Sequence, residues 1–295
     1  MTFVATRIGV WLVAGAFTRP DLVEALFLLI VLVSAPAAVG LVPSLGTCRI
    51  VGFVRPAMLP AGIALGASLA LPAGVLAGGL ALPWAAAMAA LGLVAVVDRW
   101  RRGIRADDAL AAEAALGFFA IGGLLTLAHR VGFDPAGFGP FLSLLAGVHF
   151  HVAGGLLLSA AAILLARRPG RTIRLAAALA SVGGPLTAIG FFGLPLVNVG
   201  GALLTVAGAF LVGALHVHGA RRLPRPAASA VGVAGVSLML SMPLAAGWAI
   251  GLVTGHSIVP LEVMTRVHGG LNAIGFGVVG LLGWRFAEAE AAPTR

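Results

Sequence analysis

Residues 21–42 read DLVEALFLLIVLVSAPAAVGLV, and after Glu24 this stretch contains no charged residue. A helix needs about 20 apolar residues to cross the hydrocarbon core of a bilayer, so the stretch predicts one membrane span. Strands of a membrane barrel would alternate apolar and polar residues over about ten positions, whereas this run is continuous. The stretch therefore indicates an all-α fold, a bundle of transmembrane helices.

Runs of the same kind recur along the 295-residue chain, of which 60% is hydrophobic and only 10% charged. A soluble domain of this length could not bury so much apolar surface, whereas lipid accepts it. We therefore predict about nine spanning helices joined by short loops, in one domain that covers residues 1–295. The predicted spans are 21–42, 56–76, 78–97, 109–129, 141–166, 175–196, 199–219, 228–251 and 262–284.

All 19 basic residues are arginines, and they are unevenly distributed between the predicted loops. Cytoplasmic loops of membrane proteins carry an excess of basic residues, so the richer side is predicted to be cytoplasmic. This places the N-terminus outside and the C-terminus in the cytoplasm, with lipid rather than nucleic acid as the partner. The richer side holds 15 arginines, in the loops at 43–55, 98–108, 167–174 and 220–227 and in the C-terminal tail. The other side holds Arg7, Arg19, Arg130 and Arg266.

A shorter apolar stretch, residues 8–18, precedes the first predicted span. It is short for a span, so it is an interfacial helix, an extra weak span or a signal-like segment. A signal peptide needs small residues at its cleavage site, and the sequence around Thr18 does not provide them, so we expect the segment to be retained. The single cysteine, Cys48, excludes an internal disulfide.

Two histidines, His149 and His151, lie within the fifth predicted span. Ionisable residues inside a span are energetically costly and usually functional. Side chains two positions apart on an α-helix point about 160° apart, so both imidazoles cannot face one cavity squarely. We expect His151 to enter a site that His149 orients, or the helix to be locally unwound. The alternative is that both are neutral, hydrogen-bonded side chains between helices.

The ninth predicted span carries a polar face formed by Thr265, His268, Asn272 and Gly275. These positions fall within an arc of about 80° at helical spacing, and Glu262 flanks the arc at its outer end. An amide beside an imidazole can fix the tautomer of the ring, as groups around a functional histidine do. The alternative is a polar clasp that holds two helices together.

Further polar residues collect in the outer half of the predicted membrane, which holds five of the seven histidines. This segregation is the main functional indication in the sequence. Taken singly, each of these residues is more typical of a membrane interface than of a catalyst. They are Glu24, His129, Asp134, Asn198 and His256.

On the inner side, His216 and His218 are expected to reach the lipid headgroups. Glu113 is expected to pair with an arginine of an inner loop. The sequence lacks a Walker loop, a dinucleotide fingerprint and the HExxH, GxSxG, HxxHH and CxxCH motifs, so it gives no sign of the corresponding enzyme classes or of covalent haem.

The segments HFHVAG (149–154) and HGGLNAIGF (268–276) resemble two motifs of the YndJ-like family of bacterial membrane proteins. The resemblance covers mainly residues 145–280. Proteins of this family are often labelled transporters. The resemblance marks four residues of the chain as those of interest, namely His149, His151, His268 and Asn272.

The first functional hypothesis is an intramembrane enzyme that acts on a lipophilic, isoprenoid-like molecule, as membrane-bound terpene cyclases do. Imidazoles and carboxylates in a water-poor cavity can exchange protons with an apolar substrate. In this hypothesis Glu24 or Glu262 is the acid. His151 or His268 either holds that acid ready to donate its proton or accepts a proton itself. In a metal-assisted variant, His149 or His151 and His268 are the ligands of a metal ion.

Aromatic side chains near these positions could stabilise a cationic intermediate, although plain packing is the commoner role of such residues. They are Phe118, Phe119, Phe191, Phe192 and Phe276.

The second hypothesis, ranked narrowly below the enzyme, is a transporter of a small molecule. A glycine-rich break at 183–185 favours it, while an odd number of spans and the lack of an evident repeat do not. A b-haem or quinone redox protein, and a structural or sensor protein, are further alternatives.

Overall fold

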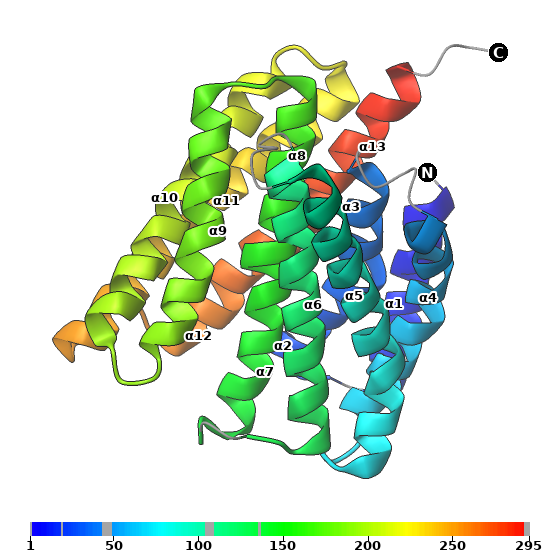
Figure 1. Cartoon of the computed structure of the whole chain (residues 1–295), viewed down its shortest axis with the longest axis vertical. Helices are drawn as coiled ribbons and strands as arrows, with labels where there is room; N and C mark the ends of the chain where they lie inside the picture. The colour runs from blue at the N-terminus through cyan, green and yellow to red at the C-terminus, as the bar shows by residue number, and fades with distance from the viewer. Residues whose placement is uncertain (1, 19, 43–48, 104–108, 135–136, 292–295) are drawn as a thin grey trace. The chain divides into compact units, whose positions relative to one another are not determined.

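The computed structural model describes residues 2–18, 20–42, 49–103, 109–134 and 137–291, which are almost entirely helical and contain no strand. Cys48 and Arg19, about which the sequence made predictions, lie outside these residues. In chain order the helices are α1 (Thr2–Thr18), α2 (Leu22–Leu29), η1 (Ile30–Ser34), α3 (Ala35–Leu41), α4 (Arg49–Leu69), α5 (Val75–Arg102), α6 (Leu110–Val131), α7 (Gly139–His149), η4 (Phe150–Leu156), α8 (Leu157–Arg167), α9 (Arg171–Gly190), α10 (Pro195–Ala220), α11 (Arg225–Thr254), α12 (Leu261–Val263), η5 (Met264–His268), η6 (Leu271–Val279) and α13 (Gly280–Ala291), as labelled in part in Figure 1.

Nine helical stretches among the described residues are long and apolar enough to cross a membrane. The first is Leu22–Leu41, which joins α2, η1 and α3, and the last is Leu261–Glu290. The predicted all-α fold with about nine spans is therefore confirmed, and the chain is a multi-pass membrane protein. The sidedness of the termini and the single domain stay predictions.

The second span shows the largest error in the predicted boundaries. Its helix, α4, begins at Arg49 and ends at Leu69, whereas the sequence predicted 56–76. The residue before a proline disfavours the helical region, so Pro72 ends the helix earlier than hydropathy alone indicates. At the other end, the arginine-containing segment that was assigned to a loop forms the first turns of the helix.

The described residues form two compact units, an N-terminal unit (Thr2–Ala162) and a C-terminal unit (Ile163–Arg295). Within the N-terminal unit α5 packs against α4 and α6, and within the C-terminal unit α10 packs against α9 and α11 (Figure 1). Small residues allow these close approaches. A Cβ atom added at Gly201 of α10 would lie only 2.3 Å from the backbone nitrogen of Thr187 in α9. Such contacts hold helices together in lipid, where no hydrophobic force gathers them.

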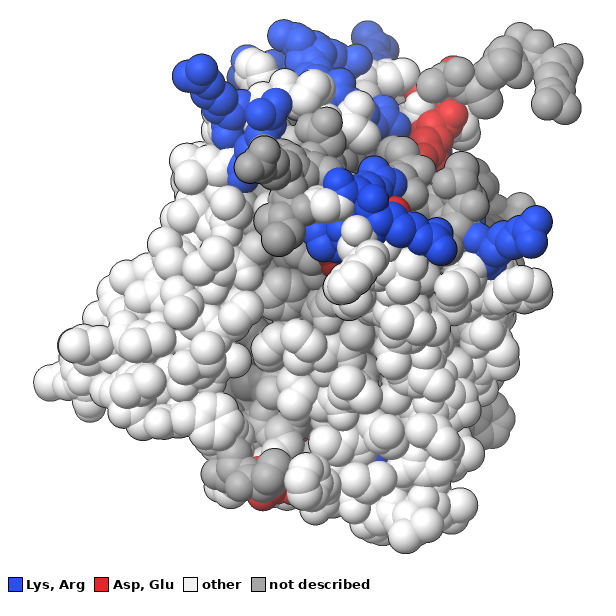
Figure 2. Space-filling model, in the orientation of Figure 1, with Lys and Arg blue, Asp and Glu red and all other residues white. Residues whose placement is uncertain are grey.

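The surface of each unit, taken by itself, agrees with a membrane environment. Figure 2 shows basic side chains gathered at helix ends, while the flanks of the helices are almost free of charge. Large apolar side chains stand exposed on these flanks, among them Phe53 at 79%, Val75 at 93% and Leu196 at 78%. Exposed apolar area of this extent is unfavourable in water and is accepted by lipid.

The first span contains a π-helical turn, η1, for which the sequence provides a reason. Pro36 has no N–H group, so the carbonyl of Leu32 lacks the donor that residue i+4 supplies in an α-helix. The Nη1 atom of Arg7 donates to this carbonyl at 2.8 Å. An arginine of α1 thus satisfies a backbone acceptor that proline has exposed in the first span.

Helix α1 lies alongside the first span and runs antiparallel to it. Arg7 bonds to Leu32, and Trp11, one turn later, donates from Nε1 to the carbonyl of Ala25 at 2.9 Å. Advancing along α1 therefore means moving back along the first span. With 17 residues, α1 is about 25 Å long, which is close to the thickness of the hydrocarbon core.

This arrangement corrects one assignment made from the sequence. Arg7 and Arg55 were placed on opposite sides of the membrane, yet both line one recess of the N-terminal unit. Two residues of one recess cannot lie across the bilayer from each other. The error arose because Arg7 and Arg19, which flank the apolar stretch at 8–18, were both counted on the outer side.

Candidate functional site

The two histidine motifs fall on π-helical segments. His151 lies in η4, and the second motif begins at the end of η5 and continues through η6. A π-helical turn bonds residue i to residue i+5, which widens the helix, and such turns occur frequently at functional sites. The local departure from α-helix that the sequence analysis offered as one explanation for the paired histidines is therefore present at His151.

His151 is completely buried and both of its ring nitrogens are engaged. The indole Nε1–H of Trp84 donates to its Nε2 atom at 3.1 Å. Because Nε2 accepts, the proton of the neutral ring is on Nδ1, which lies 2.7 Å from the carbonyl oxygen of Gly147. This geometry holds one neutral tautomer and leaves neither nitrogen open to a metal ion.

Aromatic rings and a close helix contact surround His151. The ring of Phe27 meets the imidazole edge-on with 5.2 Å between centroids, and Phe119 does so at 5.9 Å. A Cβ atom added at Gly122 of α6 would lie 2.5 Å from Nδ1 of His151. The imidazole is therefore clamped between α5, α6 and the first span.

His149 is exposed, and its Nδ1 atom faces the carbonyl of Leu145, four residues earlier in α7, at 3.1 Å. It does not contact His151, which lies on the opposite side of the helix as the spacing predicts. The two histidines therefore do not share a cavity.

In the C-terminal unit, His268 and Asn272 form a network with α11. The Nδ1–H group of His268 donates to the carbonyl oxygen of Ser241 at 3.0 Å. The amide nitrogen of Asn272 donates to the carbonyl of His268 at 2.8 Å, and the hydroxyl of Ser241 lies 3.2 Å from Asn272 Oδ1. This network holds the half-buried imidazole of His268 in one orientation against the neighbouring helix.

The other members of the predicted polar face are placed differently. Glu262 is 70% exposed and pairs with Arg266 one turn later at 3.1 Å. The hydroxyl of Thr265 bonds to backbone carbonyls of its own helix. Gly275 does face α11, because a Cβ atom there would lie 2.3 Å from the hydroxyl of Ser237. The structure thus brings His268 and Asn272 together and leaves Glu262 at the surface.

Glu24 has a local structural role. Its carboxylate accepts from the backbone N–H of Asp21, and its own N–H donates to Asp21 Oδ1 at 2.9 Å. This reciprocal capping box begins the first span and stabilises its N-terminal end. Glu24 also interacts electrostatically with Arg130.

Arg130 and His129 lie in the last turn of α6, and the sequence analysis used the arginine only as a marker of topology. Its side chain is 5% exposed, and it donates to the hydroxyl and the carbonyl of Ser68 and to the carbonyl of Leu71. It thereby satisfies carbonyls at the C-terminal end of α4. The half-buried ring of His129 lies 3.4 Å from the Arg130 guanidinium.

The predicted metal ligands are not brought together within either unit. Among the residues that the structure describes, no group of three His, Cys, Asp or Glu side chains could hold a metal ion. His149 and His151 belong to the N-terminal unit and His268 belongs to the C-terminal unit. With both nitrogens of His151 engaged, this donor set does not fit a bound metal.

His216 was expected to reach lipid headgroups, and this expectation is wrong, because the residue is 1% exposed. The indole of Trp284 donates to its Nε2 atom at 3.2 Å, and its Nδ1 atom faces the carbonyl of Val212 at 2.8 Å. The Arg167 guanidinium lies 4.8 Å from the ring centre of Trp284. Each unit thus contains one buried histidine held by a tryptophan, and hydropathy alone could not pair them.

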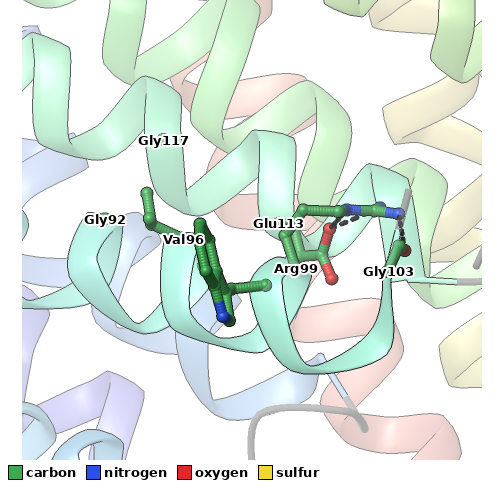
Figure 3. A pocket seen from close by; sticks show the side chains of 8 residues that line it. Gly92, Val96, Arg99, Gly103, Glu113 and Gly117 are labelled. Carbon is green, nitrogen blue, oxygen red and sulfur yellow. Dashed lines mark hydrogen bonds and ion pairs between the residues drawn. The ribbon is translucent and has the colours of Figure 1, made fainter.

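A groove of about 470 Å³ lies between the ends of α5 and α6. Figure 3 shows Gly92 and Gly117 at one end of it and the ion pair of Arg99 with Glu113 at the other. Arg99 also donates to the carbonyl of Gly103, the C-cap residue that follows α5. Glu113 thus pairs with Arg99, which the sequence analysis had assigned to the loop at 98–108 and which the structure places in the last turn of α5. Of the aromatic residues considered for cation binding, Phe191 and Phe192 are 47% and 69% exposed.

Comparison with protein families shows one match. The family model described as YndJ-like protein matches residues 25–276, which is most of the chain and includes both histidine motifs. No curated protein and no solved structure matches the chain. Because the match begins in the first span and ends in η6, it covers nearly all of the described helices. The chain therefore belongs to the YndJ-like family.

Proposed function

We propose that the protein is a small-molecule transporter of the bacterial inner membrane, with its C-terminus in the cytoplasm. The observation that carries the proposal is that both histidine motifs lie on π-helical segments, one in each compact unit. Irregular helices that carry polar residues are where transporters bind substrates and rearrange. π-Helical turns occur frequently at functional sites, and shifts of helices are among the ways in which proteins switch between states.

The geometry favours transport over the enzyme that the sequence analysis ranked first. The enzyme needs an acid with a proton to give, yet Glu262 pairs with Arg266 at the surface and Glu24 caps a helix. It also needs a base, and both nitrogens of His151 are engaged. The intramembrane enzyme that acts on an isoprenoid-like lipid stays as the second candidate because the network of His268 presents an oriented imidazole.

Transport can be tested with purified protein in liposomes. Solid-supported membrane electrophysiology, with and without a proton gradient, would screen amino acids, organic acids, nucleosides and sugars. We expect a saturable current with at least one class. It should fall about tenfold in His268→Gln, because the oriented imidazole is lost, and should persist in His256→Gln, which changes an exposed histidine.

Circular dichroism and size-exclusion chromatography would confirm that each variant is folded. A folded protein that moves none of these solutes would contradict transport. Turnover of a polyprenyl epoxide or diphosphate by the same preparation, followed by mass spectrometry, would support the enzyme instead.

A further inference from the structure

A recess of about 280 Å³ in the N-terminal unit is lined by two arginines from different helices. Arg7 comes from α1 and Arg55 from α4, and the remaining lining residues are Pro36, Gly52 and Pro56. The recess belongs to neither histidine motif. Its walls combine two positive charges with small or apolar residues.

Arg7 is held rigidly at one wall of the recess. The residue is only 4% exposed, and its Nη1 atom is fixed by the bond to the carbonyl of Leu32. A guanidinium that is positioned by packing loses little entropy when a further group binds to it. One wall of the recess is therefore pre-organised.

Arg55 supplies a second positive charge, for which the described residues provide no acidic partner. Within the described ranges of the chain Arg55 makes no hydrogen bond or ion pair, and its positive charge repels the positive charge of Arg7. Like charges at the edge of a low-dielectric region repel more strongly than in water. An anion between them would relieve this repulsion.

The described carboxylates of the unit are engaged elsewhere. They lie in the capping box of α2, in ion pairs at the ends of α5 and α6, and at the start of α7. These residues are Asp21, Glu24, Asp98, Glu113 and Asp134. The anion that the recess fits is therefore one from outside the described chain.

We propose that this recess binds a phosphate-type anion between Arg7 and Arg55. Guanidinium groups match the oxygens of a phosphate in number and geometry. Gly52 leaves room beside them, because a Cβ atom there would meet nothing within 4 Å. The phosphate is that of an anionic lipid headgroup or a free ion, and the two share the same chemistry.

Binding can be measured on the full chain purified in dodecyl maltoside. One arm titrates inorganic phosphate, and the other adds phosphatidylglycerol, with dioleoylglycerol as the matched lipid that lacks a phosphate. Thermal unfolding and native mass spectrometry report the bound species. We expect saturable stabilisation by one or both phosphates and none by dioleoylglycerol. A response to the lipid alone assigns a headgroup, and a response to inorganic phosphate assigns a free anion.

Two variants on one helix make the test specific. Arg55→Gln should weaken the apparent affinity about tenfold or more, because a charge-assisted contact is lost. Arg49→Gln removes an equal charge from an exposed position six residues earlier and should change the affinity by about twofold at most. Arg7→Lys keeps a donor for the carbonyl of Leu32 but loses the planar guanidinium group that can bind two phosphate oxygens. This variant should still fold, and it should bind the anion more weakly.

Absence of saturable stabilisation in the unmodified protein would overturn the proposal. Equal loss of affinity in Arg55→Gln and Arg49→Gln would do the same, because it would show general attraction of anions to a basic surface.

Discussion

At the scale of single residues, the buried histidines act first as hydrogen-bonded joints between helices. His151 and His216 each accept from an indole and each face a carbonyl four residues earlier. The partner tryptophans are 67 and 68 residues away in the chain, so no local pattern could have identified them. The sequence indicated that His151 lies inside a span but wrongly assigned His216 to the headgroups, and it could not identify the groups that satisfy either ring.

The clamp around His151 predicts a sharp difference between two glycines of α6. Gly122→Ala should lower the free energy of unfolding by about 1–3 kcal/mol, because the new methyl group must displace the imidazole from its bonds. Gly117→Ala, where a Cβ atom meets nothing within 4 Å, should be neutral or stabilise by up to about 1 kcal/mol. Melting temperatures in detergent would check this. Equal destabilisation by both would show that helix packing as a whole, rather than His151, sets the constraint.

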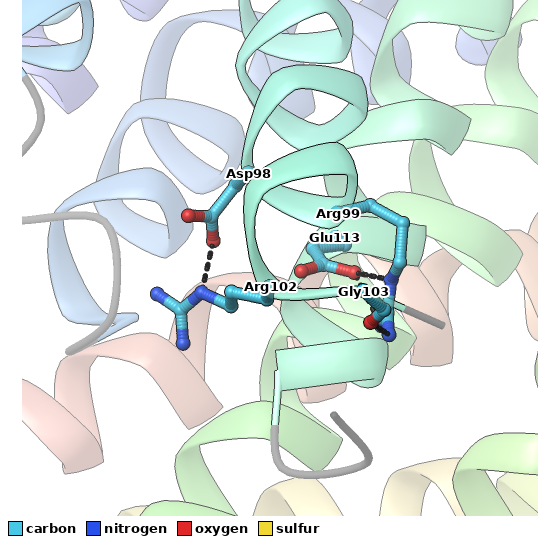
Figure 4. Close-up of polar contacts among 5 residues, drawn as sticks. All are labelled: Asp98, Arg99, Arg102, Gly103 and Glu113. Carbon is cyan, nitrogen blue, oxygen red and sulfur yellow. Dashed lines mark hydrogen bonds and ion pairs between the residues drawn. The ribbon is translucent and has the colours of Figure 1, made fainter. Parts of the chain in front are cut away.

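Two ion pairs at the end of α5 predict a second contrast, and Figure 4 shows them side by side. Glu113→Gln should destabilise by about 2 kcal/mol, because Glu113 is 8% exposed and its loss leaves the Arg99 charge poorly compensated. Asp98→Asn breaks the more exposed pair with Arg102 and should cost about 0–1 kcal/mol. The same melting assay tests both, and a larger effect of Asp98→Asn would refute the ranking.

At the scale of elements, the number of spans followed from the sequence because the length of apolar runs determines it. The π-helical segments could not be predicted, because hydropathy carries no information on the register of backbone hydrogen bonds. The segments η4 and η6 are as apolar as regular helix. Pro72 was a readable signal for the end of α4 that the apolar run obscured. The placement of α1 needed the pairing of Arg7 with Leu32, a tertiary contact.

The antiparallel packing of α1 predicts that it crosses the membrane with its N-terminal end on the arginine-rich side. In a Cys48→Ser background, Ala16→Cys should react with an impermeant maleimide in intact cells. Ala5→Cys, at the other end of α1, should react only after permeabilisation. Both positions are exposed, so access depends on the membrane alone. Labelling of both in intact cells would favour an external N-terminus, as the arginine count had predicted.

At the scale of the whole molecule, the two compact units predict that the chain tolerates a break between them. Fragments 1–169 and 170–295, cut in the short turn before α9, should each insert and resist protease when expressed separately. Each fragment contains most of one compact unit, and the cut after α8 leaves that helix whole, with Ile163–Arg167 of the C-terminal unit in the first fragment. Helices in lipid are individually stable. Rapid degradation of either fragment when expressed alone, and recovery on co-expression, would show that the units fold only together.

The proline in the first span also bears on how the protein is made. The ribosome completes α1 before it completes the helix in which Pro36 exposes the carbonyl of Leu32. A carbonyl without a donor costs several kcal/mol in hydrocarbon, so the first span gains from entering lipid together with the arginine that satisfies it. We expect the translocation channel to release α1 and the first span as one hairpin. The early pairing of α1 with the first span would then determine the orientation of every later helix.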